Sequence, residues 1–213
     1  MSERPPYHSR RTLLAGMATL SLARHAWAAG KAPVITILGD SITAGYGLRA
    51  KDALPAQLQL ALARIGTTAT VRGAGVSGDT TAGGLARLDF SVQEDTSLCI
   101  VALGGNDLLQ GLDPRTSRAN LGAIVRRLKA RGIRVLVCGM SAPRRLDARF
   151  AREFNAAFPA VARAEGVALY PNLLGGVELT AGLNQGDGIH PNARGVKIIV
   201  QRLAPVVARA LKA

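Results

Sequence analysis

Short apolar runs rich in β-branched residues alternate along this chain with longer segments whose apolar residues recur at helical spacing. This alternation is typical of parallel β-strands joined by crossover helices. The runs are apolar throughout, as expected for strands covered by helices on both faces. Strands are expected at residues 34–38, 69–72, 98–103, 135–138 and 167–170. We therefore predict an α/β fold: a three-layer α/β/α sandwich around a five-stranded parallel sheet.

Helical periodicity predicts the segments that connect these strands and follow the last of them. Helices are expected at residues 55–64, 81–88, 115–131, 147–165 and 192–211. No linker, low-complexity tract or internal repeat interrupts the chain after residue 28. A chain of 213 residues is too short to favour two domains. Residues 29–213 are therefore predicted to form a single domain.

The first 28 residues have the three parts of an export signal. A basic segment ends in a twin arginine at positions 10 and 11, a mildly apolar stretch follows at 13–23, and Ala-Trp-Ala at 26–28 fits a cleavage site. The twin arginine resembles a twin-arginine signal. An uncleaved anchor is the alternative, but residues 12–23 fall short of the ~18 apolar residues that a spanning helix needs. We expect cleavage after Ala28 and a periplasmic or secreted protein without an integral membrane segment.

The predicted domain is strongly basic. The export signal holds four arginines and one glutamate, so its removal lowers the formal net charge from +13 to +10. Such a charge could bind nucleic acid or an anionic lipid surface. Basic residues are scattered singly or in pairs and only 4% of residues are aromatic, so no nucleic-acid partner is expected. An anionic lipid surface stays open as a partner, and the protein is expected to be a monomer.

Two cysteines, Cys99 and Cys138, lie within apolar runs that are expected to be strands. Buried thiols are the prediction. A disulfide between neighbouring parallel strands is disfavoured, because its geometry would be demanding. Neither cysteine has a histidine at metal-ligand spacing, and no metal site is expected.

A glycine-bracketed turn directly after the first predicted strand carries a serine, Ser41. In open parallel sheets the ligand lies outside the carboxyl ends of the strands, so Ser41 is a candidate nucleophile. The alternative is that Ser41 caps the following helix. The turn is not the G-x-S-x-G elbow, because Thr43 stands in place of the second glycine.

His190 is the only histidine outside the predicted export signal. A serine hydroxyl needs a base to take its proton, and histidine is the usual one near neutral pH. Asp187 precedes His190 by three residues, where it can fix the imidazole tautomer. The alternative is an ordinary surface turn before a helix.

Two further loops can supply hydrogen-bond donors to an oxyanion. Gly78 follows the second predicted strand, and Asn106 follows the third after two glycines. Asn106 could instead be an ordinary turn residue, and Gly78 a glycine at the entry to a helix. Asp40 and the apolar pair Leu108 and Leu109 are candidates for substrate contact, although the leucines could equally belong to a packed loop.

Taken in order, these segments resemble the SGNH, or GDSL-type, hydrolase family. The first block is Gly-Asp-Ser-Ile at 39–42, with isoleucine in place of the usual leucine; Gly78 matches the second, Asn-Asp at 106–107 the third, and Asp-Gly-Ile-His at 187–190 the last. Within the family the bacterial periplasmic acyl-CoA thioesterase I, lysophospholipase L1 and arylesterase enzymes are the most similar.

The resemblance implies a flavodoxin-like SGNH hydrolase fold and a serine esterase or thioesterase. Ser41 would be the nucleophile, His190 the base and Asp187 its orienting partner. The Ser41 and Gly78 N–H groups and the Asn106 side chain would form the oxyanion hole. The implied substrate is a small acyl ester or thioester, such as an aryl ester, an acyl-CoA or a lysophospholipid. It would be cleaved through an acyl-Ser41 intermediate without a cofactor or metal.

Two other functions stay open. The same blocks would serve a carbohydrate O-acetylesterase, since a fold does not decide the substrate. The apolar pair after Asn106 and the scarcity of aromatic residues favour acyl chains. A non-catalytic flavodoxin-like binding module is the second alternative, but the phosphate-binding motif G-x-x-x-x-G-K-[ST] is missing from the sequence.

Overall fold

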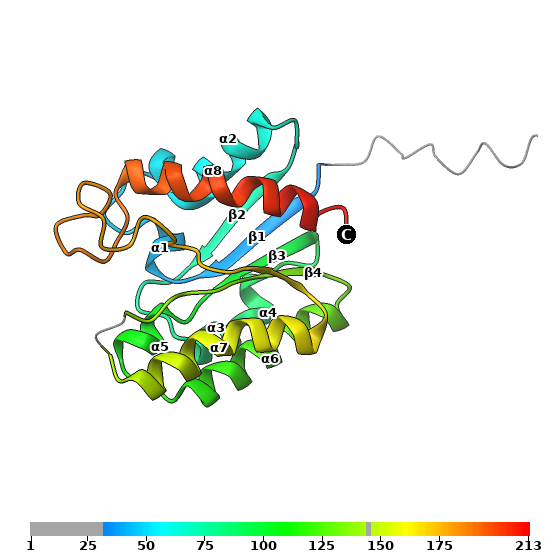
Figure 1. Cartoon of the computed structure of the whole chain (residues 1–213). Coiled ribbons are helices and arrows are strands. Elements are labelled where there is room, and N and C mark those ends of the chain that lie inside the picture. Colours follow the sequence, from blue (N-terminus) through cyan, green and yellow to red (C-terminus); the bar gives the residue numbers. More distant parts are fainter. Residues whose placement is uncertain (1–31, 144–145) are drawn as a thin grey trace, which may run out of the picture. The chain divides into compact units, whose positions relative to one another are not determined.

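The computed structural model describes residues 32–143 and 146–213. The predicted export signal lies outside the described residues. In the described part, which forms one compact unit from Ala32 to Ala213, five strands form one parallel sheet (Figure 1). The sheet order is β2-β1-β3-β4-β5. The strands are β1 (Val34–Gly39), β2 (Thr70–Gly75), β3 (Thr96–Ala102), β4 (Arg134–Cys138) and β5 (Ala168–Tyr170). This is the flavodoxin-like order, and the predicted fold class is confirmed.

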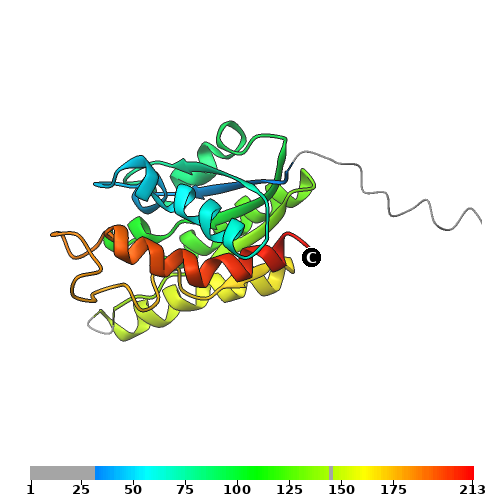
Figure 2. The same ribbon diagram turned by 90° about the horizontal axis from the view of Figure 1, so that it is seen from above.

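Helices cover both faces of the sheet. On one face α2 (Leu54–Arg64) and α8 (Ala193–Ala210) lie side by side, as Figures 1 and 2 show. On the other face α6 (Pro114–Ala130) packs between α3 (Thr81–Ala86) and α7 (Ala148–Glu165). Shorter segments are α1 (Ser41–Ala44), the 3₁₀ helix η1 (Ala50–Asp52), α4 (Leu88–Ser91) and α5 (Gly105–Leu109).

Side-chain caps begin the long helices where the sequence predicts them. Asp113, Asp147 and Asn192 accept hydrogen bonds from the first backbone N–H groups of α6, α7 and α8. Two short segments differ from expectation. The helix predicted at 81–88 is two helices that part at Arg87, and the apolar stretch after Asn106 belongs to α5 instead of a loop.

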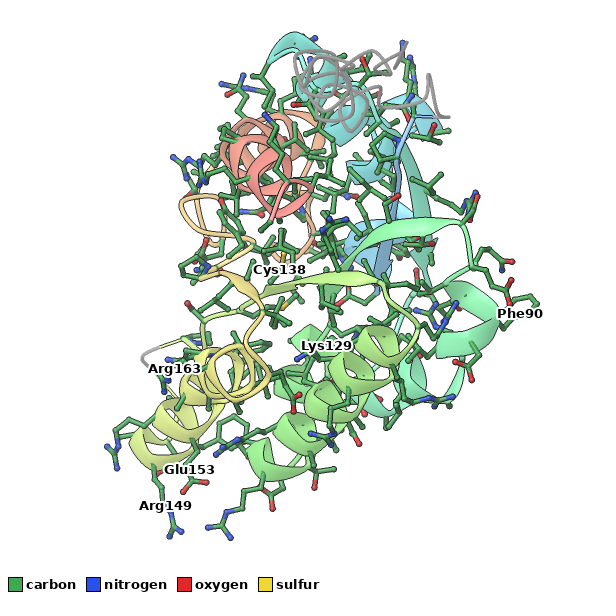
Figure 3. The ribbon with its side chains drawn as sticks, turned by 90° about the vertical axis from the view of Figure 1, so that its right-hand side faces the viewer. Phe90, Lys129, Cys138, Arg149, Glu153 and Arg163 are labelled. Carbon is green, nitrogen blue, oxygen red and sulfur yellow. The ribbon has the colours of Figure 1, made fainter. Side chains whose placement is uncertain are left out.

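The three central strands, β1, β3 and β4, are buried on both faces, because a helix layer covers each face of the sheet, whereas the edge strands β2 and β5 are partly exposed. Ile35, Ile37 and Ile100 have no exposed surface. Figure 3 shows Cys138 between the two helix layers, whereas Phe90 projects outward at the molecular edge. Cys99 and Cys138 are both buried free thiols, as predicted. Burial raises the pKa of Cys99 to about 12 and raises that of Cys138 as well.

A helix that spans a bilayer needs about 20 mostly apolar residues. Within residues 32–143 and 146–213, no helix combines the length and the apolar composition needed to cross a bilayer.

Candidate active site

Ser41 is the first residue of α1, directly after β1. The preceding residue caps this helix: Asp40 Oδ1 accepts a hydrogen bond of 3.0 Å from the Ile42 N–H. The capping role that Ser41 could have had therefore falls to Asp40. The serine hydroxyl instead lies 2.8 Å from His190 Nε2.

Ser41, His190 and Asp187 form a continuous hydrogen-bonded chain. On the far side of the imidazole, His190 Nδ1 lies 2.6 Å from Asp187 Oδ2. The other carboxylate oxygen of Asp187 accepts from the backbone N–H groups of Ile189, at 2.9 Å, and His190, at 3.0 Å. The side-chain hydrogen bond with His190 and then these backbone bonds lower the pKa of Asp187 to about 2. The carboxylate is therefore ionised at neutral pH and favours the tautomer that carries hydrogen on Nδ1.

The Tyr46 ring packs against the imidazole of His190. The two ring centroids are 4.7 Å apart and the ring planes are tilted by 36°. Asp187 holds the imidazole at Nδ1, and the contact with the Tyr46 ring further limits its rotation. The sequence carries no pattern that links a tyrosine five residues after Ser41 to the histidine.

The two predicted donor loops line the same pocket as Ser41. Gly78 has a φ of +84°, a backbone conformation that residues other than glycine rarely adopt. Asn106 Nδ2 donates to the Asp79 carbonyl over 2.9 Å. An amide nitrogen carries two hydrogens, so the second is left for a substrate oxygen.

Gly105 allows α5 to lie close to Asp40, the residue before Ser41. A Cβ at this position would be 3.2 Å from Asp40 Oδ2 and 3.2 Å from Met140 Sδ. Both contacts are tighter than side chains normally make, so a larger residue would move Asn106 away from Ser41.

A buried carboxylate that the sequence analysis assigned no role, Asp107, joins three helices. It accepts hydrogen bonds from the Thr81 N–H (2.8 Å), Thr81 Oγ1 (2.5 Å) and Ser117 Oγ (2.8 Å). Its place directly after Asn106 is a signal that could have been used, because a carboxylate beside a buried apolar strand needs donors nearby.

Arg87 joins the loop that carries Ser41 to the loop that carries Gly78, a role that no sequence pattern indicates. Its guanidinium donates to Asp79 Oδ2 (2.6 Å), to the Gly39 carbonyl (2.8 Å) and to the Ala74 carbonyl (2.9 Å). Gly39 ends β1 just before Ser41, and Asp79 follows Gly78. The guanidinium also donates to Ser91 Oγ (2.9 Å), and two of these four partners are backbone carbonyls, which leave no mark in the sequence.

Asp40 is a buried carboxyl at the pocket wall. Only 2% of its surface is exposed. Burial raises the pKa of Asp40 to about 6, against the opposing effects of the hydrogen bond from Ile42 and of nearby His190. Asp40, predicted as a substrate contact, therefore lies at the pocket but presents little surface to it.

A pocket of about 310 Å³ lies over the carboxyl ends of the strands. Both predicted leucines line it, and so do apolar side chains from segments that the sequence analysis left unassigned. The lining residues are Asp40, Ser41, Ile42, Tyr46, Ser77, Gly78, Gly105, Asn106, Leu108, Leu109, Met140, Ser141, Asn172, Leu174, Glu178, Ile189 and His190. No cluster of three or more potential metal ligands occurs among the described residues.

Comparison with known proteins agrees with this geometry. Residues 37–198 match the GDSL-like Lipase/Acylhydrolase family. Esterase TesA of Pseudomonas aeruginosa is 39% identical over 85% of this chain and 90% of its own length. Thioesterase 1/protease 1/lysophospholipase L1 of Escherichia coli K12 is 36% identical over 77% of this chain and 78% of its own.

A solved structure gives the same result in three dimensions. The SGNH-hydrolase family esterase AlinE4 is 44% identical with a TM-score of 0.72, covering 87% of this chain and all of AlinE4. A family match that spans most of the chain, together with these relatives, leads to one conclusion: the chain belongs to the GDSL-like lipase/acylhydrolase family.

Proposed function

We propose that this protein is a serine hydrolase that cleaves acyl esters and thioesters through an acyl-Ser41 intermediate. One observation carries the proposal: Ser41 Oγ, the His190 imidazole and the Asp187 carboxylate form a hydrogen-bonded chain with distances of 2.8 and 2.6 Å. Names of relatives support the reaction class, since they describe an esterase and a thioesterase/lysophospholipase.

The first half-reaction acylates the serine. As Ser41 Oγ attacks the acyl carbonyl, His190 Nε2 takes its proton and Asp187 stabilises the resulting imidazolium. Negative charge on the former carbonyl oxygen is met by the N–H groups of Ser41 and Gly78 and by Asn106 Nδ2. Each such donor contributes about 10²- to 10³-fold in rate. Collapse of this first tetrahedral species completes acylation: His190 gives its proton to the leaving alkoxide or thiolate, which departs as the alcohol or thiol.

The second half-reaction releases the acid. A water then attacks the acyl-Ser41 carbonyl while His190 takes one of its protons. Collapse of the second tetrahedral species returns that proton to Ser41 and frees the carboxylic acid. This sequence needs no cofactor.

The pocket lining favours an acyl chain as the substrate group. Leu108, Leu109, Met140, Leu174 and Ile189 supply apolar surface beside Ser41. Tyr46 is the only Phe, Tyr or Trp among the described residues that line the pocket, and its ring packs against His190, so it is not free to stack on a sugar ring. We therefore propose small acyl esters or thioesters, including lysophospholipids, as the substrate class.

The cellular setting follows from the sequence. We propose that residues 1–28 export the protein through the twin-arginine route and that residues 29–213 act as a single, monomeric domain in the periplasm or outside the cell. The formal net charge of +10 after cleavage would favour encounters with an anionic lipid surface, where lysophospholipids occur.

Active-site labelling and turnover test the proposal together. The protein that begins at residue 29 is treated with an organophosphonate probe and assayed with p-nitrophenyl esters, beside Ser41→Ala and His190→Ala. We expect stoichiometric labelling of Ser41 in the wild type, and turnover reduced by about 10⁴-fold or more in both variants. A wild-type protein that is neither labelled nor active would contradict the proposal.

A further inference from the structure

The substrate pocket extends from the nucleophile along the carboxyl edge of the sheet. Its lining comes from loops after successive strands in sheet order: Ser41 after β1, Asn106 after β3, Met140 after β4 and Glu178 after β5. Neighbouring strands lie about 4.8 Å apart, so the carboxyl ends of β1 and β5 are about 14 Å apart across the sheet. The pocket therefore has a direction, with Ser41 near one end and the β5 loop at the other.

Apart from Ser141, the side chains that line the stretch between these ends are apolar. Leu108 lines it from α5, Met140 from the loop after β4, and Leu174 from the loop after β5. An acyl chain bound to Ser41 would place its methylene groups along this wall. The polar oxyanion donors lie at the Ser41 end.

A polar pair, Asn172 and Glu178, lines the pocket on the side of the β5 loop. Asn172 Nδ2 donates to Glu178 Oε1 over 2.7 Å, and the Val177 N–H donates to Glu178 Oε2 over 3.3 Å. Asn172 Oδ1 in turn accepts from the Leu174 N–H at 3.1 Å. Both oxygens of the carboxylate are thus held, and Asn172 and Glu178 both line the pocket.

The loop that carries this pair is fixed to the sheet. The Gly139 N–H donates to the Tyr170 carbonyl over 2.8 Å, and the Gly139 carbonyl accepts from the Leu173 N–H at 2.8 Å. The Leu173 and Val177 side chains are buried in the core. Because backbone hydrogen bonds and buried side chains both hold the loop, Glu178 cannot easily move away from an arriving acyl chain.

We propose that Glu178 is a specificity-determining residue that sets the upper length of the acyl chain, an inference that rests on the proposed esterase function. An alkyl group that reached Glu178 would remove water from the carboxylate without offering a hydrogen bond, which is unfavourable. An extended chain advances about 1.2 Å per bond, so a span of about 14 Å holds about ten to twelve carbons. Longer chains meet the carboxylate.

The test compares two chain lengths within each variant. For p-nitrophenyl octanoate and p-nitrophenyl myristate, both kept below their aggregation concentrations, kcat/KM is measured and the myristate-to-octanoate ratio is taken. The variants are Glu178→Leu, which replaces the carboxylate by apolar surface, and Glu178→Gln, which removes the charge but keeps the shape and an acceptor. Glu94→Leu is the matched control, because Glu94 is an exposed carboxylate just before β3, at the amino ends of the strands, and does not line the pocket.

We expect the ratio to rise about tenfold in Glu178→Leu and about threefold in Glu178→Gln, and to keep its wild-type value in Glu94→Leu. Taking the ratio within one variant removes any effect on folding yield or on the chemical step. An unchanged ratio in either Glu178 variant that hydrolyses octanoate overturns the inference while the esterase function stands. A wild type that hydrolyses neither ester and resists the phosphonate overturns the proposed function, and the inference with it.

Discussion

Asp40 links the pH of the solution to the stability of the fold. Burial raises its pKa from 3.8 to about 6. Between these two pH values the folded state therefore binds more protons than the unfolded chain, and the free energy of unfolding falls as the pH rises through this window. Above about pH 6 the folded state carries a constant cost of about 3 kcal/mol, since one pKa unit corresponds to 1.36 kcal/mol.

The variant Asp40→Asn should remove this cost. Asparagine resembles the protonated acid and keeps an oxygen that can accept from the Ile42 N–H. We expect its free energy of unfolding to match the wild type within about 1 kcal/mol at pH 4 and to exceed it by about 2–3 kcal/mol at pH 7.5. Urea denaturation at both pH values measures the difference.

An exposed aspartate provides the control for this measurement. Asp113 caps α6 as Asp40 caps α1, but it lies in water. Asp113→Asn should not become more stable than the wild type toward pH 7.5, because this exposed side chain stays in water when the chain folds. If Asp40→Asn shows the same difference at pH 4 and pH 7.5, the carboxyl is not titrating in this window.

Single residues differ in how well the sequence predicts their place. Asp187 and His190 are three residues apart in one glycine-containing turn, so their contact is local and could be expected. Gly78 and Asn106 could be named as donors only because each follows a predicted strand. Arg87 could not be placed, since its carbonyl acceptors lie 13 and 48 residues away and belong to no particular residue type.

Among the elements, α3 and the residues at its two ends hold the donor loops in place. At its start, the Thr81 N–H and hydroxyl donate to Asp107, which follows Asn106 on α5. At its end, Arg87 donates to Asp79 and to the last carbonyl of β1, that of Gly39. The relative placement of the proposed oxyanion donors therefore depends on a helix that contributes no lining residue of its own to the pocket.

Replacing Arg87 by lysine should loosen this arrangement. A lysine ammonium is a compact point charge that cannot reproduce the planar fork of the guanidinium. We expect kcat for a short ester to fall about 10- to 100-fold while KM changes less than about threefold, because small displacements of reacting groups are costly. The free energy of unfolding should fall by about 2 kcal/mol, since Asp79 is left partly buried with a poorer partner.

Steady-state kinetics and urea denaturation measure both effects, with Arg126→Lys as the control. Arg126 pairs with Glu165 over 2.7 Å on the exposed side of α6, where an ion pair contributes little. A rise in KM with an unchanged kcat in Arg87→Lys would mean that this arginine acts on substrate binding and not on the placement of the donors.

The five strands and the long helices could be predicted within a few residues. Each strand is a short apolar run, and each long helix repeats its apolar residues over several turns. The short helices could not. At 81–91 the chain leaves the helix at Arg87, whose side chain binds the carbonyl ends of two strands. At 105–109 one turn of helix is too short to show a period.

At the scale of the whole molecule, the order of the strands places the site. The chain order turns back between β1 and β3, so β1 is flanked by β2 and β3 and the loops after all three strands meet at Ser41. The alternation of strands and helices predicts a parallel sheet but not which strands are neighbours. That order depends on packing across the whole unit, and it came into the sequence analysis only through the resemblance to a known family.

The two thiols report whether this unit opens as a whole. Cys99 on β3 and Cys138 on β4 have no exposed surface, and burial raises the pKa of both, so the reactive thiolate is scarce in the folded state. Reaction with a disulfide reagent such as DTNB should therefore be negligible in the folded protein and should give two thiols per chain in denaturant.

Because both residues lie in the central core, they should react at one common rate that follows global unfolding. A reductant should leave the midpoint of urea unfolding unchanged. Rapid reaction of one thiol under native conditions would instead show that the sheet opens locally between β3 and β4, beside the loops that carry Asn106 and Met140.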